Sequence, residues 1–308
     1  MRKLLLNLPY LLLLLVSTGC LVKQEPQATY SELLVTRGDI VVASFTSDSL
    51  VVFNADGVFQ RILYQLPNPV GDSITGLTWL PETNEILMAI DGTPDRVDAL
   101  SVATGLVRTF YNNTTYLTGT PLLIAQLKTS ADILVSEGPT IERFSVNGIR
   151  ETWTTIWPTS VHLNTQQLVG LSTGKWLSCS STAGLRITPD STTVLTATAT
   201  ATSLIAATTA SYGCAELSTG TIVVGWNGTT DTIQTYTATL TGATTLISNA
   251  AVFGDPRGIA IGENDEIYVA DGTRNVIVEL DTLGNVVREF GNSYLQSPRA
   301  MMVVPAFN

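Results

Sequence analysis

Four oxygen-bearing side chains follow apolar segments at points where the chain turns, and calcium takes ligands of this kind. They are Asp91, Glu137, Asn227 and Asp271. Calcium binds roughly six to eight oxygen atoms from carboxylates, amides and carbonyls, so these side chains would form a calcium site if the fold brought them to one opening. Asp91 and Asp271 are each followed by glycine, however, and Asp-Gly is a common turn dipeptide. The sequence leaves both interpretations open.

Two arginines stand in matching local sequences near the end of the chain. Arg257 lies in Pro-Arg-Gly and Arg299 lies in Pro-Arg-Ala. Neighbouring guanidinium groups bind a carboxylate or a phosphate through paired hydrogen bonds, which makes both arginines candidate ligand-binding residues. Pairing with a nearby acid such as Asp255 is the alternative use. Further candidate ligand-binding residues precede them in the sequence: Trp226, Asn227 and Asp231.

The remaining reactive side chains support no catalytic site. His162 is the only histidine, and we interpret it as an ordinary loop residue. One histidine and widely separated cysteines fit no zinc-ligand spacing. Neither a Gly-rich phosphate loop nor a basic stripe is present. Cys179 and Cys214 either form a disulfide in an oxidising compartment or remain two buried thiols, and their spacing does not decide between these.

The elements that position these residues recur every 45 residues or so. The repeated position, at the start of an extended apolar segment, holds Ile40, Ile86, Ile133, Trp176, Ile222 and Ile267, which are 46, 47, 43, 46 and 45 residues apart. Three residues further on stands a small side chain in every repeat: Ala43, Ala89, Ser136, Cys179, Gly225 and Ala270. Six all-β repeats of this length predict a six-bladed β-propeller of four-stranded antiparallel blades. The small residues then reflect core packing, because blades narrow towards the axis.

The two ends of the repeat region predict how the propeller closes. Residues 38–65 supply three strands and lack the usual first one, whereas residues 297–304 supply one strand after the last repeat. That last strand repeats the entry strand of the sixth blade, with Pro298-Arg299-Ala300 in place of Pro256-Arg257-Gly258. We therefore predict that the C-terminal strand completes the first blade in a 1+3 arrangement, which removes exposed sheet edges.

The sixth repeat resembles the NHL repeat, a β-propeller repeat. The resemblance rests on Pro256-Arg257-Gly258-Ile259 as entry strand and on Tyr268-Val269-Ala270-Asp271 as second strand. It covers this one blade, and the usual Asn-His step is replaced by Arg274-Asn275. The resemblance implies a scaffold or binding module. Six-bladed propellers of the lactonase and gluconolactonase kind hold a calcium ion at the channel mouth, so similarity to them implies a metal-dependent hydrolase or lyase instead.

The first residues resemble the signal of a bacterial lipoprotein. Arg2 and Lys3 precede an apolar run from Leu4 to Val16, and Ser17-Thr18-Gly19-Cys20 follows. This pattern is that of a cleaved export signal rather than a membrane span. The resemblance implies cleavage before Cys20 and lipidation of that cysteine. Leu21, which is not Asp, implies the outer membrane if the organism is Gram-negative. The alternative is an ordinary secretory signal.

These boundaries divide the chain into a signal peptide at 1–19, a lipidated cysteine and flexible tether at 20–35, and a propeller at 36–308. Removing residues 1–19 takes away two basic residues and no acidic one, which leaves a net charge of −12. An acidic surface argues against nucleic acid as a partner, and the membrane is then reached through the lipid anchor only.

Two functions follow from this sequence. The first is a monomeric binding or scaffold module that presents its loop face to a protein, peptide or glycan of the cell envelope. The loop face is the one that carries the turns between second and third strands and the connections between blades. The second is a calcium-dependent, lactonase-like enzyme that uses Asp91, Glu137, Asn227 and Asp271. The sequence favours the first, because it shows no catalytic constellation.

Overall fold

The computed structural model describes residues 33–67, 71–112, 122–137, 140–151, 165–182, 184–188, 203–205 and 210–307. The chain divides into two units, Met1–Ser31 and Glu32–Asn308, and all described residues belong to the second. The predicted signal peptide, Cys20 and most of the predicted tether therefore lie outside the described residues, as does His162. The part of the chain that is described contains no helix long and apolar enough to cross a membrane.

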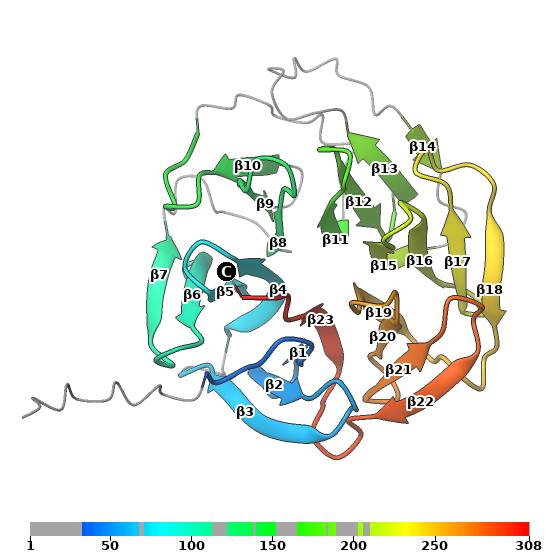
Figure 1. Ribbon diagram of the computed structural model, residues 1–308, viewed down its shortest axis with the longest axis horizontal. Helices are drawn as coiled ribbons and strands as arrows, with labels where there is room; N and C mark the ends of the chain where they lie inside the picture. The colour runs from blue at the N-terminus through cyan, green and yellow to red at the C-terminus, as the bar shows by residue number, and fades with distance from the viewer. Residues whose placement is uncertain are drawn as a thin grey trace, which may run out of the picture. The chain divides into compact units, whose positions relative to one another are not determined.

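The second unit is a ring of six antiparallel sheets, which confirms the predicted six-bladed β-propeller (Figure 1). Blade 1 contains β23 (Pro298–Val303), β1 (Ile40–Ser44), β2 (Ser49–Phe53) and β3 (Phe59–Gln65), and blade 2 contains β4 (Ser73–Leu80), β5 (Glu85–Asp91), β6 (Arg96–Ser101) and β7 (Val107–Tyr111). Blade 3 contains, within the described residues, β8 (Leu122–Gln126), β9 (Ile133–Glu137) and β10 (Thr140–Phe144). Blade 4 contains β11 (Thr165–Gly170), β12 (Trp176–Ser180), β13 (Gly184–Thr188) and β14 (Ser203–Ile205). Blade 5 contains β15 (Ala210–Glu216), β16 (Ile222–Asn227), β17 (Thr232–Tyr236) and β18 (Thr244–Ser248), and blade 6 contains β19 (Pro256–Ile261), β20 (Ile267–Asp271), β21 (Val276–Leu280) and β22 (Val286–Phe290).

The C-terminal strand closes the ring as predicted. β23 pairs antiparallel with β1, with Ile40 opposite Val303 and Val42 opposite Met301. The ladder continues past the strand ends, because the Val304 amide donates to the Asp39 carbonyl oxygen at 2.8 Å. β23 also packs against the inner strands β19 and β4 of the blades on either side. Blade 1 therefore combines the two ends of the described chain in one sheet.

Burial follows the position of each strand in its blade. The second strands are almost wholly buried, since both of their faces contact neighbouring blades; β1 and β20 are buried at every residue. The fourth strands form the outer wall, and β22 and β18 are partly exposed at every residue. Apolar runs without alternation fit the two-sided burial of the second strands. The core consists of six apolar clusters, one between each pair of adjacent blades.

The molecule has two faces, which we name by their connections. The connection face carries the turns between second and third strands and the links between blades. The hairpin face carries the turns between first and second strands and between third and fourth strands. In blade 1 the ends of the described chain stand in for the first of these hairpin turns, because β23 and β1 are not consecutive.

A disulfide joins Cys179 of β12 to Cys214 of β15, with 6.3 Å between their Cα atoms. It cross-links blades 4 and 5 across their shared apolar cluster. The two cysteines are 35 residues apart in sequence, and closing a loop of that length stabilises a fold by about 2–4 kcal/mol.

Candidate functional site

A β-bulge interrupts the inner strand of five blades at one equivalent position. The pairing register shifts between Ile74 and Gly76, and the strands of blades 1, 4, 5 and 6 shift at matching points. In each case two inner-strand residues stand opposite one small residue of the second strand, as Arg257 and Gly258 do opposite Ala270. A bulge redirects a side chain that regular pairing would point elsewhere. The conserved spacing of the repeat therefore places one redirected side chain per bulged blade near the channel.

These redirected side chains line the connection-face end of the channel. They surround a cavity of only 30 Å³, whose lining is Thr75, Leu123, Gln166, Tyr212, Arg257, Gly258 and Arg299. We call this set the inner ring. It unites Arg257 and Arg299, which the sequence predicted to lie together, with polar side chains from blades 2, 4 and 5.

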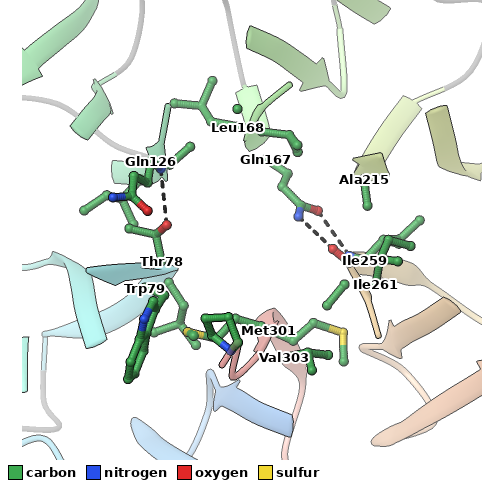
Figure 2. Close-up of a pocket in the computed structure, with 18 of the residues that line it drawn as sticks. Thr78, Trp79, Gln126, Gln167, Leu168, Ala215, Ile259, Ile261, Met301 and Val303 are labelled. Carbon is green, nitrogen blue, oxygen red and sulfur yellow. Dashed lines mark hydrogen bonds between the residues drawn. The ribbon is translucent and has the colours of Figure 1, made fainter. Parts of the chain in front are cut away.

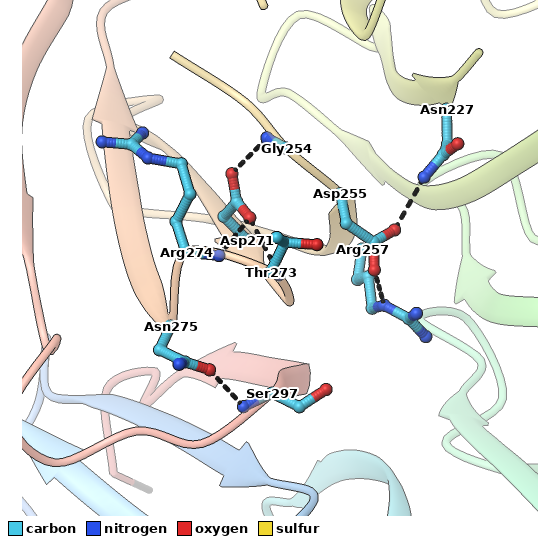
Figure 3. Close-up of polar contacts among 9 residues, drawn as sticks. All are labelled: Asn227, Gly254, Asp255, Arg257, Asp271, Thr273, Arg274, Asn275 and Ser297. Carbon is cyan, nitrogen blue, oxygen red and sulfur yellow. Dashed lines mark hydrogen bonds and ion pairs between the residues drawn. The ribbon is translucent and has the colours of Figure 1, made fainter. Parts of the chain in front are cut away.

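The two arginines have different surroundings. The Arg257 Nε donates to the Asp255 carboxylate at 2.5 Å, so the predicted pairing with Asp255 is present (Figure 3). The Arg299 guanidinium instead lies over the Phe45 ring, 3.6 Å from its centroid. Its Nε is buried and makes no hydrogen bond within the described residues. A buried donor without an acceptor costs free energy unless a ligand or water supplies one.

Burial and a neighbouring positive charge both disfavour the charged form of Arg299. Burial lowers the pKa of Arg299, and the positive charge of Arg257 lowers it further. The negative charges of Asp255 and Asp91 raise the pKa of Arg299, but by less than burial and Arg257 lower it. A bound carboxylate would offset both effects, because it supplies opposite charge and hydrogen-bond acceptors together.

Three of the predicted calcium ligands begin the same turn in three blades. Asp91, Asn227 and Asp271 each open a five-residue turn of the form Asp/Asn-Gly-Thr-x-Asp/Asn. Within these turns the Gly92 amide donates to Asp95 at 2.8 Å and the Gly228 amide donates to Asp231 at 3.0 Å. These carboxylates satisfy backbone amides of their own turns, which is the role that Asp and Asn have in many tight turns.

Asp271 and Asn227 are also held by neighbouring segments, as Figure 3 shows. The Asp271 carboxylate accepts from the amides of Gly254, Thr273 and Arg274 at 2.7–3.1 Å. The Asn227 side-chain amide donates to Asp255 at 2.7 Å. Glu137 ends β9, and its side chain lies outside the description. No group of three or more His, Cys, Asp or Glu side chains among the described residues is arranged to hold a metal.

The other predicted ligand-binding residues lie away from the inner ring. Trp226 is 6% exposed and packs against Tyr236 in the apolar cluster between blades 4 and 5. Asp231 is buried in its turn, and burial together with the charges of Asp255 and Asp271 raises its pKa. Both residues therefore support the fold around the opening and do not line it.

Asp91 gives a pH-dependent prediction. Burial raises the pKa of Asp91, and the charge of Asp95 and a hydrogen bond with it raise it further. The folded chain then holds this proton more tightly than the unfolded chain, so the unfolding free energy falls as pH rises through the two pKa values. We expect Asp91→Asn to raise the melting temperature relative to wild type at pH 7, with a difference that shrinks towards pH 3.

Asp281 provides the control for this prediction, because its pKa is shifted in the opposite direction. A hydrogen bond from the Asn285 side chain, followed by backbone amides, lowers the pKa of Asp281. Its stabilising contribution is present at neutral pH and is lost as pH falls, so Asp281→Asn should lower the melting temperature at pH 7. Thermal unfolding followed by circular dichroism at both pH values measures the two differences. A difference at Asp91 that does not change with pH would contradict the prediction.

The wider end of the channel opens on the hairpin face. A cavity of 470 Å³ lies there, lined by all six inner strands and by Pro81, Lys128, Pro305 and Ala306 at its rim (Figure 2). The sequence pointed to the connection face as the ligand face, yet the larger cavity is on the other. The reason is side-chain size, because arginine, tyrosine and glutamine fill the inner ring whereas Ala125, Gly170 and Ala215 line the wider end.

The Gln167 side chain connects the inner strands of three blades at the channel wall. Its side chain crosses from β11 and donates to the Ile259 carbonyl oxygen at 2.9 Å, while its own oxygen accepts from the Ile259 and Cys214 amides at 3.1 Å (Figure 2). The amide thus bonds the inner strands β11, β15 and β19 together.

One catalytic motif is present in the sequence without its structural context. Gly170-Leu171-Ser172-Thr173-Gly174 has the Gly-x-Ser-x-Gly form of a hydrolase nucleophile elbow. Here it forms the hairpin turn between β11 and β12, and the Ser172 hydroxyl donates to the Glu216 carboxylate at 2.7 Å. An elbow joins a strand to a helix and exposes its serine beside a histidine. This motif therefore gives no support to serine hydrolysis.

Sequence reasoning missed Thr75, Gln166 and Tyr212 as inner-ring residues. A signal was available, since Thr75, Tyr212, Arg257 and Arg299 each precede a glycine or alanine in an inner strand. The small residue is needed because the neighbouring inner strand passes directly over it: a Cβ built on Gly213 would overlap the Arg257 carbonyl oxygen. Gln167 occupies this position in blade 4, which hides the pattern there.

No family model and no curated protein matches this sequence. Many solved structures match its fold. A chain from the nidogen/laminin complex has a TM-score of 0.65 and 11% identity, over 88% of this chain and 99% of that chain. TolB from Acinetobacter baumannii has a TM-score of 0.65 and 13% identity, over 87% and 67% of the two chains. A gluconolactonase from Xanthomonas campestris has a TM-score of 0.56 and 12% identity, over 82% and 88%. At such identities the likeness concerns the fold alone, and the chain is a six-bladed β-propeller.

Proposed function

We propose that this protein is an exported binding module, lipid-anchored through Cys20, that recognises a carboxylate-bearing protein, peptide or glycan of the cell envelope at its inner ring. The observation that carries this proposal is the Arg299 side chain. It is largely buried, its Nε makes no hydrogen bond within the described residues, and it lies near a second arginine. An anion is the ligand that such an arrangement favours.

The size of the opening restricts the ligand to a small terminal group. The 30 Å³ between the inner-ring side chains is about the volume that one water molecule occupies in the liquid. A carboxylate can approach the planar Arg299 guanidinium group at the inner ring, while the rest of the partner remains on the connection face. Tyr212 and Gln166 add polar contacts around that group. The ring thus supports recognition of an acidic side chain, a chain terminus or an acidic sugar.

Export and a protein partner have separate support. Disulfides persist in oxidising compartments, so the Cys179–Cys214 bond favours a location outside the cytosol. One structure of the same fold was solved as a nidogen/laminin complex, so a propeller of this kind can serve as a protein-binding module. Both observations agree with an envelope module and neither requires a catalytic site.

The test compares the thermal response of three proteins to small anions. Acetate and glutarate should raise the melting temperature of the wild type. Arg299→Met keeps a long side chain over Phe45 but removes the charge, and it should weaken carboxylate binding roughly 10- to 100-fold, as expected for hydrogen bonds to a charged group. Arg61→Met, at an exposed arginine of β3, is the matched control and should respond as wild type does.

Two results would count against the proposal. An unchanged response in Arg299→Met would remove the inner ring as the anion site. A melting temperature that rises with calcium and falls with chelator would favour the lactonase-like alternative, because a ligand bound only by the native state stabilises it.

A further inference from the structure

Exposed aliphatic side chains mark the hairpin face on four blades. They stand in the turns between third and fourth strands: Val58 at 56% exposure, Leu106 at 71%, Ile149 at 67% and Leu283 at 78%. Each lies next to a glycine that gives the turn its positive φ. Turn tips normally carry polar residues, and single exposed aliphatics need no explanation, but a repeat of them on one face of the ring does.

The described chain begins on this same face. The Leu34 amide donates to the Val102 carbonyl oxygen at 2.8 Å, in the turn that carries Leu106. Leu33, before it, is itself 38% exposed. The first described residues therefore lie at the hairpin face. From Cys20 to that point there are 13 residues, which span at most about 45 Å when fully extended.

Other features of the face agree with a lipid neighbour. The 470 Å³ cavity with its aliphatic and methionine lining opens here. Lys128 and Lys175 lie in first-to-second-strand turns of this face, and Lys23 lies in the predicted tether; these are the only lysines after residue 19. The Lys128 ammonium donates to the Glu216 carboxylate at 2.8 Å, and the Lys128 side chain is 51% exposed. A lysine can place its aliphatic stem on apolar surface while its ammonium stays at the polar interface. The acidic balance of the chain disfavours anionic lipid, so the matching surface is a zwitterionic one.

We infer that the hairpin face lies against a lipid bilayer, with Val58, Leu106, Ile149 and Leu283 in contact with it. This inference rests on the proposed lipid anchor, which keeps the face within a short distance of the membrane and so raises its effective concentration there. The inner ring then points away from the membrane. The hairpin face would then contact the membrane, and the connection face would bind the partner.

The experiment uses the full-length lipidated protein in phosphatidylcholine vesicles. Leu106→Cys and Leu283→Cys are each labelled with an environment-sensitive dye, since the described native cysteines are held in the disulfide. Ile62→Cys on the outer strand β3 is the matched control, because Ile62 is 58% exposed but lies on the side wall. Gln296→Cys reports the connection face. We expect a blue-shifted emission and quenching by brominated lipid at Leu106 and Leu283 only.

The possible outcomes separate the anchor from the orientation. Flotation with the vesicles and no dye shift at Leu106 or Leu283 overturns the membrane contact and leaves the anchor standing. Failure to float overturns both. Equal shifts at Ile62 show non-specific adsorption and also overturn the inference. A shift that appears without lipid and grows with protein concentration assigns the face to a second copy of the chain instead.

Discussion

Removal of residues 297–308 should abolish the cooperative melting transition and leave an unfolded or aggregating chain. The truncation deletes β23, whose Met301, Met302 and following Val304 are buried against blades 1, 2 and 6. It also exposes the edge of β1, a strand with no exposed residue. An uncovered apolar edge pairs with other chains. Size-exclusion chromatography and circular dichroism measure the result.

A shorter truncation is the control. Removing only residues 306–308 leaves every β23 pair and the Val304 hydrogen bonds in place, so that variant should stay monomeric and fold. A peptide of residues 297–308 added to the longer truncation should restore part of the folded population. A stable, monomeric chain lacking 297–308 with unchanged melting would show that closure through β23 is not needed.

Gly258→Ala should destabilise the protein by about 3 kcal/mol. A Cβ on Gly258 would overlap the Arg299 carbonyl oxygen, and that atom belongs to backbone and not to a flexible side chain. To remove this overlap, β19 and β23 would have to move apart, and the packing of the two neighbouring blades opposes that movement. Overpacking of this kind typically costs about 1–3 kcal/mol, and a clash with backbone lies at the upper end. Urea unfolding measures the difference.

Gly225→Ala is the matched substitution in a second strand. Its added Cβ would meet nothing closer than the Ile259 Cδ1 at 3.5 Å, which is ordinary contact. Blades 1, 2 and 6 already carry alanine at the equivalent position. We expect that the free energy of unfolding does not fall and rises by at most about 1 kcal/mol, because alanine reduces the entropy of the unfolded chain. Equal effects of the two substitutions would contradict the account of inner-strand packing.

The propeller could be predicted because its signal is spread over the whole sequence. The spacing from Ile40 to Ile267 depends on six separate buried strands, and a displaced apolar residue in one of them does not hide the period. The missing first strand of blade 1 and the extra strand at 298–303 point to the same closure. Blade 6 has the clearest local pattern, because Asp, Asn and Gly mark the turns between its strands.

The site was harder to predict because a bulge changes which way a side chain points. Period-two alternation does not reveal that Tyr212 or Gln166 reaches the channel, since the register shifts beside them. The acidic residues were hard to interpret for a different reason. Asp271 and Asp95 are acidic residues at the connection face, but their oxygens accept hydrogen bonds from backbone amides, and the sequence alone does not show which donor a carboxylate serves.

The position of β23 also sets the order of events during synthesis. Among the described strands, the first strand of blade 1 is the last to be synthesised, so β1 has no inner partner until residues 298–303 have been made. Loop-closure entropy then opposes completion of the ring for as long as the C-terminal residues are missing. A chain with this topology keeps its ring open until β23 has been made, which would suit the export that we propose.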